Sequence, residues 1–196
     1  MIRFTLALAL MAAPALAAPG TDPDWPCIQR LQPHLSLGQV WSGPAPDEGM
    51  ADLAREPAIA RLADRLEQRR LPLEEAEADI AAFADGADAD RMVALMQAVF
   101  DRIDRDRAAL IAGISRYGRA QLALSERIDA RRGRMAELEA AEDPDFDALD
   151  AEEAALDWDT RIFTERQQSL TYVCETPVIL EQRVFALGRV IAGHLD

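Results

Sequence analysis

The stretch AELEAAEDPDFDALDAEEAALDWD, residues 136–159, carries eleven carboxylates and no basic residue. Asp143, Asp145 and Asp147 stand at alternate positions, as in the first half of an EF-hand calcium loop. The glycine at the sixth place of that loop and the glutamate at the twelfth are both replaced by alanine. These three carboxylates therefore predict weak binding of divalent cations rather than a specific calcium site.

Two cysteines, Cys27 and Cys174, are a second candidate for chemistry. Neither belongs to a C-x-x-C motif or to a βαβ pattern, which argues against a redox pair. In an oxidising compartment one such pair most simply forms a structural disulfide. The bridge would close a loop of about 147 residues, for which the chain-entropy model gives on the order of 4–5 kcal/mol.

Other catalytic and cofactor motifs are missing from the sequence. His34 and His194 are the two histidines, and neither has a metal-ligand partner at a diagnostic spacing. The segment Gly113–Gly118 lacks the G-x-S-x-G spacing of a nucleophile elbow, and no glycine-rich phosphate-binding loop occurs. The sequence predicts no enzyme and no cofactor.

Residues 1–18 have the layout of a secretory signal peptide. Arg3 supplies the positive start, Phe4–Ala13 an apolar run, and Ala15-Leu16-Ala17 the small residues of a cleavage site after Ala17 or Ala18. No later stretch reaches the roughly 18 apolar residues that a membrane span needs. We therefore expect a soluble protein exported to the periplasm of a Gram-negative bacterium.

The formal net charge is −14, and all 21 basic residues are arginines. An acidic chain is unsuited to nucleic-acid backbones and anionic lipids, which both select positive surfaces. The charge is compatible with cationic partners and with divalent metal ions.

Residues 19–47 contain six prolines and three glycines, which exclude a long helix. We expect this segment to extend across the rest of the protein, fixed by its tryptophans and by Cys27. Residues 48–87 should form the short helices of a base. One helix begins at Pro57, and another follows Pro72 and ends at Asp85-Gly86.

A hairpin of two helices is predicted for residues 88–176. Asp88 or Asp90 caps the first helix, whose apolar residues recur at seven-residue intervals to about Glu142, as in a coiled coil. The turn near 143–146 would place Asp143 as the next cap and Pro144 in the first helical turn. Three glycines weaken the first helix by roughly 1 kcal/mol each relative to alanine: Gly113, Gly118 and Gly133.

Pro177 should break the returning helix, with Thr176 capping a separate helix over residues 177–196. This last segment is apolar around most of its circumference, which is typical of a buried helix. We expect its apolar residues Val184, Phe185, Leu187 and Ile191 to pack against Met96, Phe100 and Ile103.

Folding the hairpin at Asp143 pairs its two apolar series, with Leu138 facing Leu149, Leu124 facing Phe163 and Ile103 facing Val184. The same register brings acidic residues opposite the arginines of 127–134. These are Glu152, Glu153, Asp157 and Asp159. Two independent patterns thus favour one hairpin, in which charge sets the register.

The predicted class is all-α: a small helical base, a long antiparallel coiled-coil-like hairpin and an extended proline-rich N-terminal segment. The hairpin either projects from the base or packs on it. We expect a non-enzymatic interaction or adaptor protein that binds an envelope protein with a basic surface. A client-binding chaperone or a weak cation binder is the alternative. Candidate partner-binding residues are Asp145, Asp147, Asp150, Glu152 and Glu153.

Overall fold

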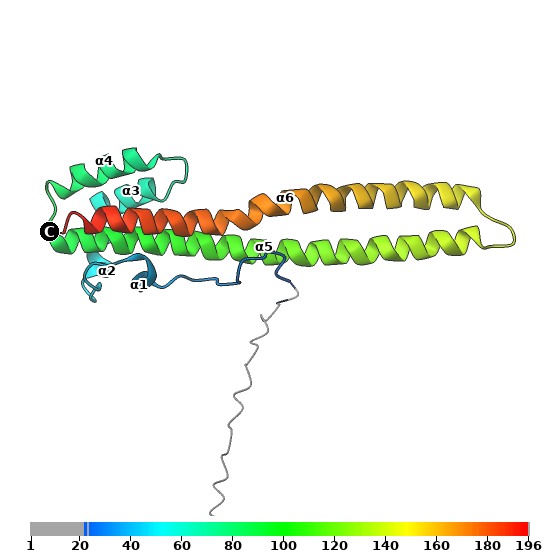
Figure 1. Cartoon of the computed structure of the whole chain (residues 1–196), viewed down its shortest axis with the longest axis horizontal. Helices are drawn as coiled ribbons and strands as arrows, with labels where there is room; N and C mark the ends of the chain where they lie inside the picture. The colour runs from blue at the N-terminus through cyan, green and yellow to red at the C-terminus, as the bar shows by residue number, and fades with distance from the viewer. Residues whose placement is uncertain (1–21, 23, 196) are drawn as a thin grey trace, which may run out of the picture.

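The computed structural model describes residues 22 and 24–195, and every regular element among them is a helix (Figure 1). The helices are α1 (Leu37–Val40), α2 (Met50–Leu53), α3 (Pro57–Leu66), α4 (Leu73–Ala84), α5 (Ala89–Glu139) and α6 (Phe146–Ala192). The all-α class and the hairpin of α5 and α6 are confirmed. The predicted signal peptide, residues 1–18, lies outside the described residues.

The short helices surround the open end of the hairpin and form the base. Figure 1 shows α3 and α4 on one side of it and α1 and α2 on the other. The core between them combines residues from nearly every element: Val40, Trp41, Ile59, Leu66, Ile80, Leu95, Met96, Val99, Ile103, Val184, Leu187 and Ile191. The predicted burial of Val184, Leu187 and Ile191 in this core is confirmed.

Phe185 is a correction to the predicted core, because its side chain is 45% exposed. The guanidinium of Arg189 lies over the ring, 5.2 Å from its centroid, in a cation–π arrangement. The buried residues Leu180, Val184, Leu187 and Ile191 recur at three- and four-residue spacing, and Phe185 lies beside that stripe. The base covers only one side of α6. The prediction that this segment is buried on all sides, which rested on its apolar composition, therefore overestimated its burial.

The predicted break at Pro177 is wrong, because α6 is one helix from Phe146 to Ala192 with Pro177 inside it. Thr176 does not cap a new helix; its Oγ1 donates to the carbonyl of Tyr172, one turn back, at 3.2 Å. Proline removes one helical hydrogen bond. Cys174 and Leu180, on either side of Pro177, are both buried. Their tertiary packing outweighs the loss of one helical hydrogen bond and keeps the helix continuous.

The turn of the hairpin begins earlier than predicted and ends later, so that Pro144, predicted in the first turn of the returning helix, precedes that helix. Helix α5 ends at Glu139, and Asp145 caps α6 by accepting a hydrogen bond from the Ala148 amide at 3.0 Å. The prediction of Asp143 as the cap is therefore wrong by two residues. Of the two caps predicted for α5, Asp88 is the one observed, since it accepts from the Arg91 amide at 2.9 Å.

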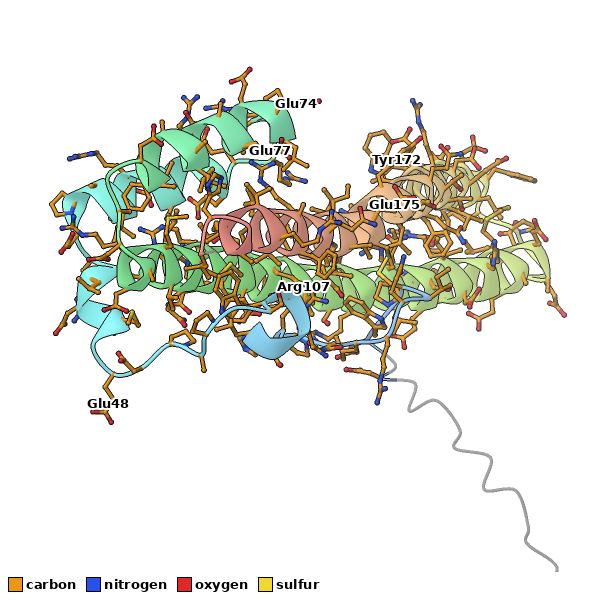
Figure 2. The ribbon with its side chains drawn as sticks, turned by 60° about the vertical axis from the view of Figure 1, so that its left-hand side comes forward. Glu48, Glu74, Glu77, Arg107, Tyr172 and Glu175 are labelled. Atoms are coloured by element: carbon orange, nitrogen blue, oxygen red, sulfur yellow. A yellow bond between two sulfur atoms is a disulfide. The ribbon has the colours of Figure 1, made fainter. Side chains whose placement is uncertain are left out.

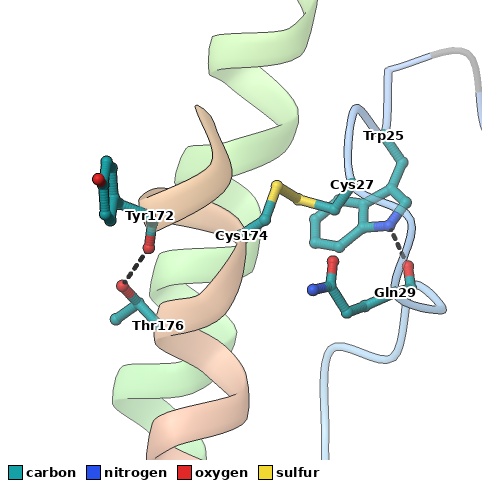
Figure 3. Close-up of a disulfide and its surroundings, with 6 residues drawn as sticks. All are labelled: Trp25, Cys27, Gln29, Tyr172, Cys174 and Thr176. Atoms are coloured by element: carbon teal, nitrogen blue, oxygen red, sulfur yellow. Dashed lines mark hydrogen bonds between the residues drawn. A yellow bond between two sulfur atoms is a disulfide. The ribbon is translucent and has the colours of Figure 1, made fainter. Parts of the chain in front are cut away.

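The proline-rich segment lies along α5 and is fastened at its start by the predicted disulfide between Cys27 and Cys174, whose Cα atoms are 5.7 Å apart (Figure 3). Gly118 of α5 allows the backbone of this segment to come close, because a Cβ there would overlap the carbonyl oxygen of Asp24. Farther along, the carboxylate of Asp104 accepts from the Leu35 amide at 2.7 Å.

Two glycines of α5 should respond to alanine in opposite directions. Gly118→Ala should lower the free energy of unfolding by about 1–3 kcal/mol, the usual cost of overpacking, because the N-terminal segment would be displaced. Gly133→Ala should raise it by up to about 1 kcal/mol, since no atom lies within 4 Å of a Cβ there. Urea unfolding of both variants checks this. A destabilised Gly133→Ala protein would contradict the open helix face.

Phe185→Ala should lower the free energy of unfolding by about 1 kcal/mol, because nearly half of the ring is already in water. Leu187→Ala, two residues on and fully buried, should cost about 2–5 kcal/mol. Chemical denaturation of the two proteins makes the comparison. Equal losses would mean that the base covers α6 on the side of Phe185 too.

Candidate functional site

The distal part of the hairpin, residues 120–172, is named the arm. Figure 1 shows it extending beyond α1–α4. The α5 side alone, residues 120–139, spans about 30 Å at 1.5 Å per residue. Within the described residues, no helix is long and apolar enough to cross a membrane.

A cluster of four charged residues joins the two helices of the arm. Arg127 makes a bidentate contact to Asp159, with distances of 2.8 and 2.9 Å. Arg131 reaches both Asp159, at 2.8 Å, and Glu152, at 2.9 Å. Both carboxylates are buried between the helices. Hydrogen bonds from Arg127 first, and then from Arg131, lower the pKa of Asp159 from 3.8 to about 2.

The predicted register agrees with the structure to within one helical turn. The carbonyl of Phe163, predicted to lie opposite Leu124, accepts from the Gln121 side chain at 3.3 Å. The pairing of the arginines with Asp159 and Glu152 is confirmed. Glu153 and Asp157, predicted in the same set, are exposed and form no ion pair within the described chain.

Apolar contact between the helices decreases toward the tip. Ile114, Leu124 and Ile128 are buried in the seam, but no hydrophobic side chain between Ile128 and Asp159 is. Two aromatic residues of that region face solvent instead: Phe146 is 72% exposed and Trp158 is 62% exposed. Aromatic side chains are enriched at protein–protein interfaces relative to the rest of the protein surface. Sequence reasoning missed both of them.

The predicted acidic residues take different positions at the tip. Asp143, Asp145, Asp147 and Asp150 are all exposed, and Asp145 also caps α6. Glu152 differs, because its carboxylate is buried against Arg131 and cannot meet a partner without breaking that pair. In the part of the chain that the structure describes, no three Asp, Glu, His or Cys side chains are grouped as metal ligands would be.

Arg107 is a further residue that the sequence did not single out. It lies on α5 in the base, is 5% exposed, and donates through Nη1 to the carbonyls of Gln32 and Pro33 (Figure 2). One signal was present in the sequence. Arg107 occupies the heptad position that holds Phe100 one repeat earlier and Ile114 one repeat later. An arginine at an apolar seam position predicts a buried guanidinium with specific acceptors.

Asp159→Asn should lower stability in a pH-dependent manner. The pKa of Asp159 in the folded protein, about 2, lies below the ordinary 3.8, so its ionised form stabilises the fold above pH 3.8. The stability difference between the unmodified protein and the variant should therefore shrink as pH falls from 3.8 through 2. Urea unfolding between pH 2 and pH 6 measures it. Asp157→Asn, at an exposed carboxylate without an arginine partner, is the control, and identical profiles would contradict the cluster's role.

No model of a protein family matches this chain, and neither a curated protein nor a solved structure is similar to it. A function for the chain therefore has to follow from its own geometry. That geometry offers a projecting arm with exposed aromatic and acidic side chains, and a base that contains a buried arginine.

Proposed function

We propose that this chain is an exported, non-enzymatic adaptor whose arm docks onto a basic surface of another envelope protein. The observation that carries the proposal is the state of the distal arm, residues 127–159. This part projects from the base, leaves Phe146 and Trp158 exposed, and has no buried apolar side chain after Ile128. A partner that covers it would remove apolar surface from water, which favours association.

The charge of the distal arm specifies the chemistry of the partner. Residues 127–159 contain four arginines and twelve carboxylates, a net charge of −8. Two of the arginines, Arg127 and Arg131, are directed at buried carboxylates inside the hairpin. The outer surface is therefore acidic, which steers a basic partner toward the arm and rejects acidic ones. Exposed aromatic side chains such as Trp158 would supply most of the affinity.

Export is supported by the predicted leader and by one structural feature. A disulfide between cysteines 147 residues apart suits a compartment in which thiols are oxidised. We place the adaptor in the periplasm on these grounds.

A second candidate function is binding of unfolded client proteins. It is favoured by a groove of about 440 Å³ between α1 and α6, lined by Val40, Val178 and the half-exposed Phe185. Such a groove in the base would take apolar side chains from many clients, whereas the arm would select one basic partner. The experiment that tests the adaptor also separates these two functions.

A photo-crosslinking side chain at Ala154 of the exported protein, an exposed residue one turn from Trp158 on α6, should capture one partner in stoichiometric yield. Replacing Asp147 and Asp150 by Asn and Glu153 by Gln should reduce capture at least about tenfold, because each removes an exposed charge from the docking surface. Capture should also fall as salt rises. The matched control removes three exposed carboxylates from the base, Glu48, Glu74 and Glu77, each changed to Gln (Figure 2).

Equal loss in the control variant would show that net charge alone, and not the arm, decides binding. Capture of many unrelated clients would favour the chaperone-like function. A crosslinker at Phe185 instead of Ala154 should then give the higher yield. Absence of any captured protein from either position would contradict both functions.

A further inference from the structure

A small cavity in the base is enclosed by the N-terminal segment, by α5 near Arg107 and by α6 near Pro177. Its volume is about 190 Å³, and its walls include Trp25, Gln29, Arg107, Ile111 and Pro177. Cys174 also lines it, so the disulfide fixes the N-terminal segment beside it (Figure 3). The cavity is on the base, apart from the distal arm, and its occupant is a separate question from the partner of the arm.

Two buried polar atoms on these walls have no hydrogen-bond partner among the described residues: Nε of Arg107 and Oε1 of Gln29. The Arg107 side chain is 6% exposed, so bulk water does not solvate it. Its Nη1 donates to backbone carbonyls, and its Nη2 lies 3.5 Å from a carboxylate oxygen of Glu181, a long contact. A buried donor and a buried acceptor left unpaired are each costly, which indicates that the cavity has an occupant.

The remaining walls limit what that occupant is. The indole N–H of Trp25 already donates to the carbonyl of Gln29 at 2.6 Å, so the ring presents apolar surface (Figure 3). Ile111, Pro177 and Val178 add aliphatic surface, and the polar residues Arg30, Gln32 and Glu181 complete the lining. The occupant must therefore combine an acceptor for Arg107, a donor for Gln29 and a short apolar body.

We propose that the cavity binds a small carboxylate with a second, hydrogen-bond-donating group, of the size of an α-amino or α-hydroxy acid. The carboxylate accepts from Nε of Arg107, which has no partner among the described residues, while Nη2 keeps its long contact to Glu181. The ammonium or hydroxyl group donates to Oε1 of Gln29. A volume of about 190 Å³ suits a ligand of this small size.

An inorganic anion fits these walls less well. Phosphate or chloride would satisfy Arg107 but would bring no apolar body to Trp25 and Ile111. Chloride also has no donor for Gln29. Water would satisfy both polar atoms, and it is the outcome that the experiment must separate from a ligand.

Calorimetric titration of the oxidised full chain should use alanine, lactate, propionate and inorganic phosphate as probes. Alanine or lactate should bind saturably. Propionate has the carboxylate without the second donor and should bind at least about threefold more weakly, because Gln29 stays unpaired. Phosphate should compete only weakly, because it brings no apolar body to the cavity. Failure of every organic probe to saturate at 10 mM or below, on the order of 10⁻² M, would overturn the proposal.

Substitutions of residues that line the cavity test whether the probe binds there. Arg107→Gln should weaken binding at least about tenfold, as expected for the loss of a charged hydrogen bond. Because that change also affects the N-terminal segment, Val178→Phe provides a second test by filling the cavity from α6. The control is Ile179→Phe, at a neighbouring residue that is 44% exposed.

Val178→Phe should abolish binding and Ile179→Phe should leave it unchanged. Binding that survives Val178→Phe, or falls equally in both variants, would place the ligand elsewhere and overturn the proposal. A crystal structure soaked in the tightest probe that shows water alone bridging Arg107 and Gln29 would do the same.

Discussion

The pairing of α5 with α6 is the interaction on which the rest of the structure depends. Near the base the two helices share a buried apolar seam that α1–α4 complete, from Met96 and Val184 outward. Toward the tip no other helix of the described chain lies on α5 and α6, and apolar burial ends at Ile128. There the two helices are joined by the buried contacts of Arg127 and Arg131 with acidic residues of α6. These contacts specify the register, because a shifted alignment of the helices would separate the paired charges.

This change from apolar to charged pairing links the fold to the proposed function. A seam that stayed apolar to the tip would need cover from the base or from a second chain. A seam closed by ion pairs can stand in water, which leaves the outer carboxylates and Trp158 free for a partner. In the base, the N-terminal segment fastened at Cys27 completes the walls of the cavity at Arg107.

Much of this fold could be predicted from the sequence, because seven-residue periodicity and complementary charges are local and repeated. The hairpin and its approximate register follow from such patterns, whereas the disulfide follows from a single pair of cysteines in a chain expected to be exported. The effect of Pro177 could not be predicted from such patterns. Whether a proline ends a helix depends on how the residues on either side of it pack, which is a tertiary property. Phe185 shows a similar limit, since composition does not tell which side of a helix the base covers.

The candidate sites were predictable in part. Acidic composition located the tip of the arm, but the burial of Glu152 and the exposure of Trp158 depend on the rotation of α6 against α5. The unpaired state of Arg107 Nε and Gln29 Oε1 depends on segments that are distant in sequence. Sequence patterns report periodicity and charge, whereas these features arise from three-dimensional contacts.

The central claim is that the arm stands away from the base, and a distance between two spin labels tests it most directly. Asp90 and Ala136 are exposed residues near the two ends of α5 and are suitable positions. A continuous helix separates them by about 69 Å at 1.5 Å per residue. The account predicts one narrow distribution near that value. A distribution centred below roughly 50 Å would mean that α5 is bent and the arm packs back on the base, contradicting the account.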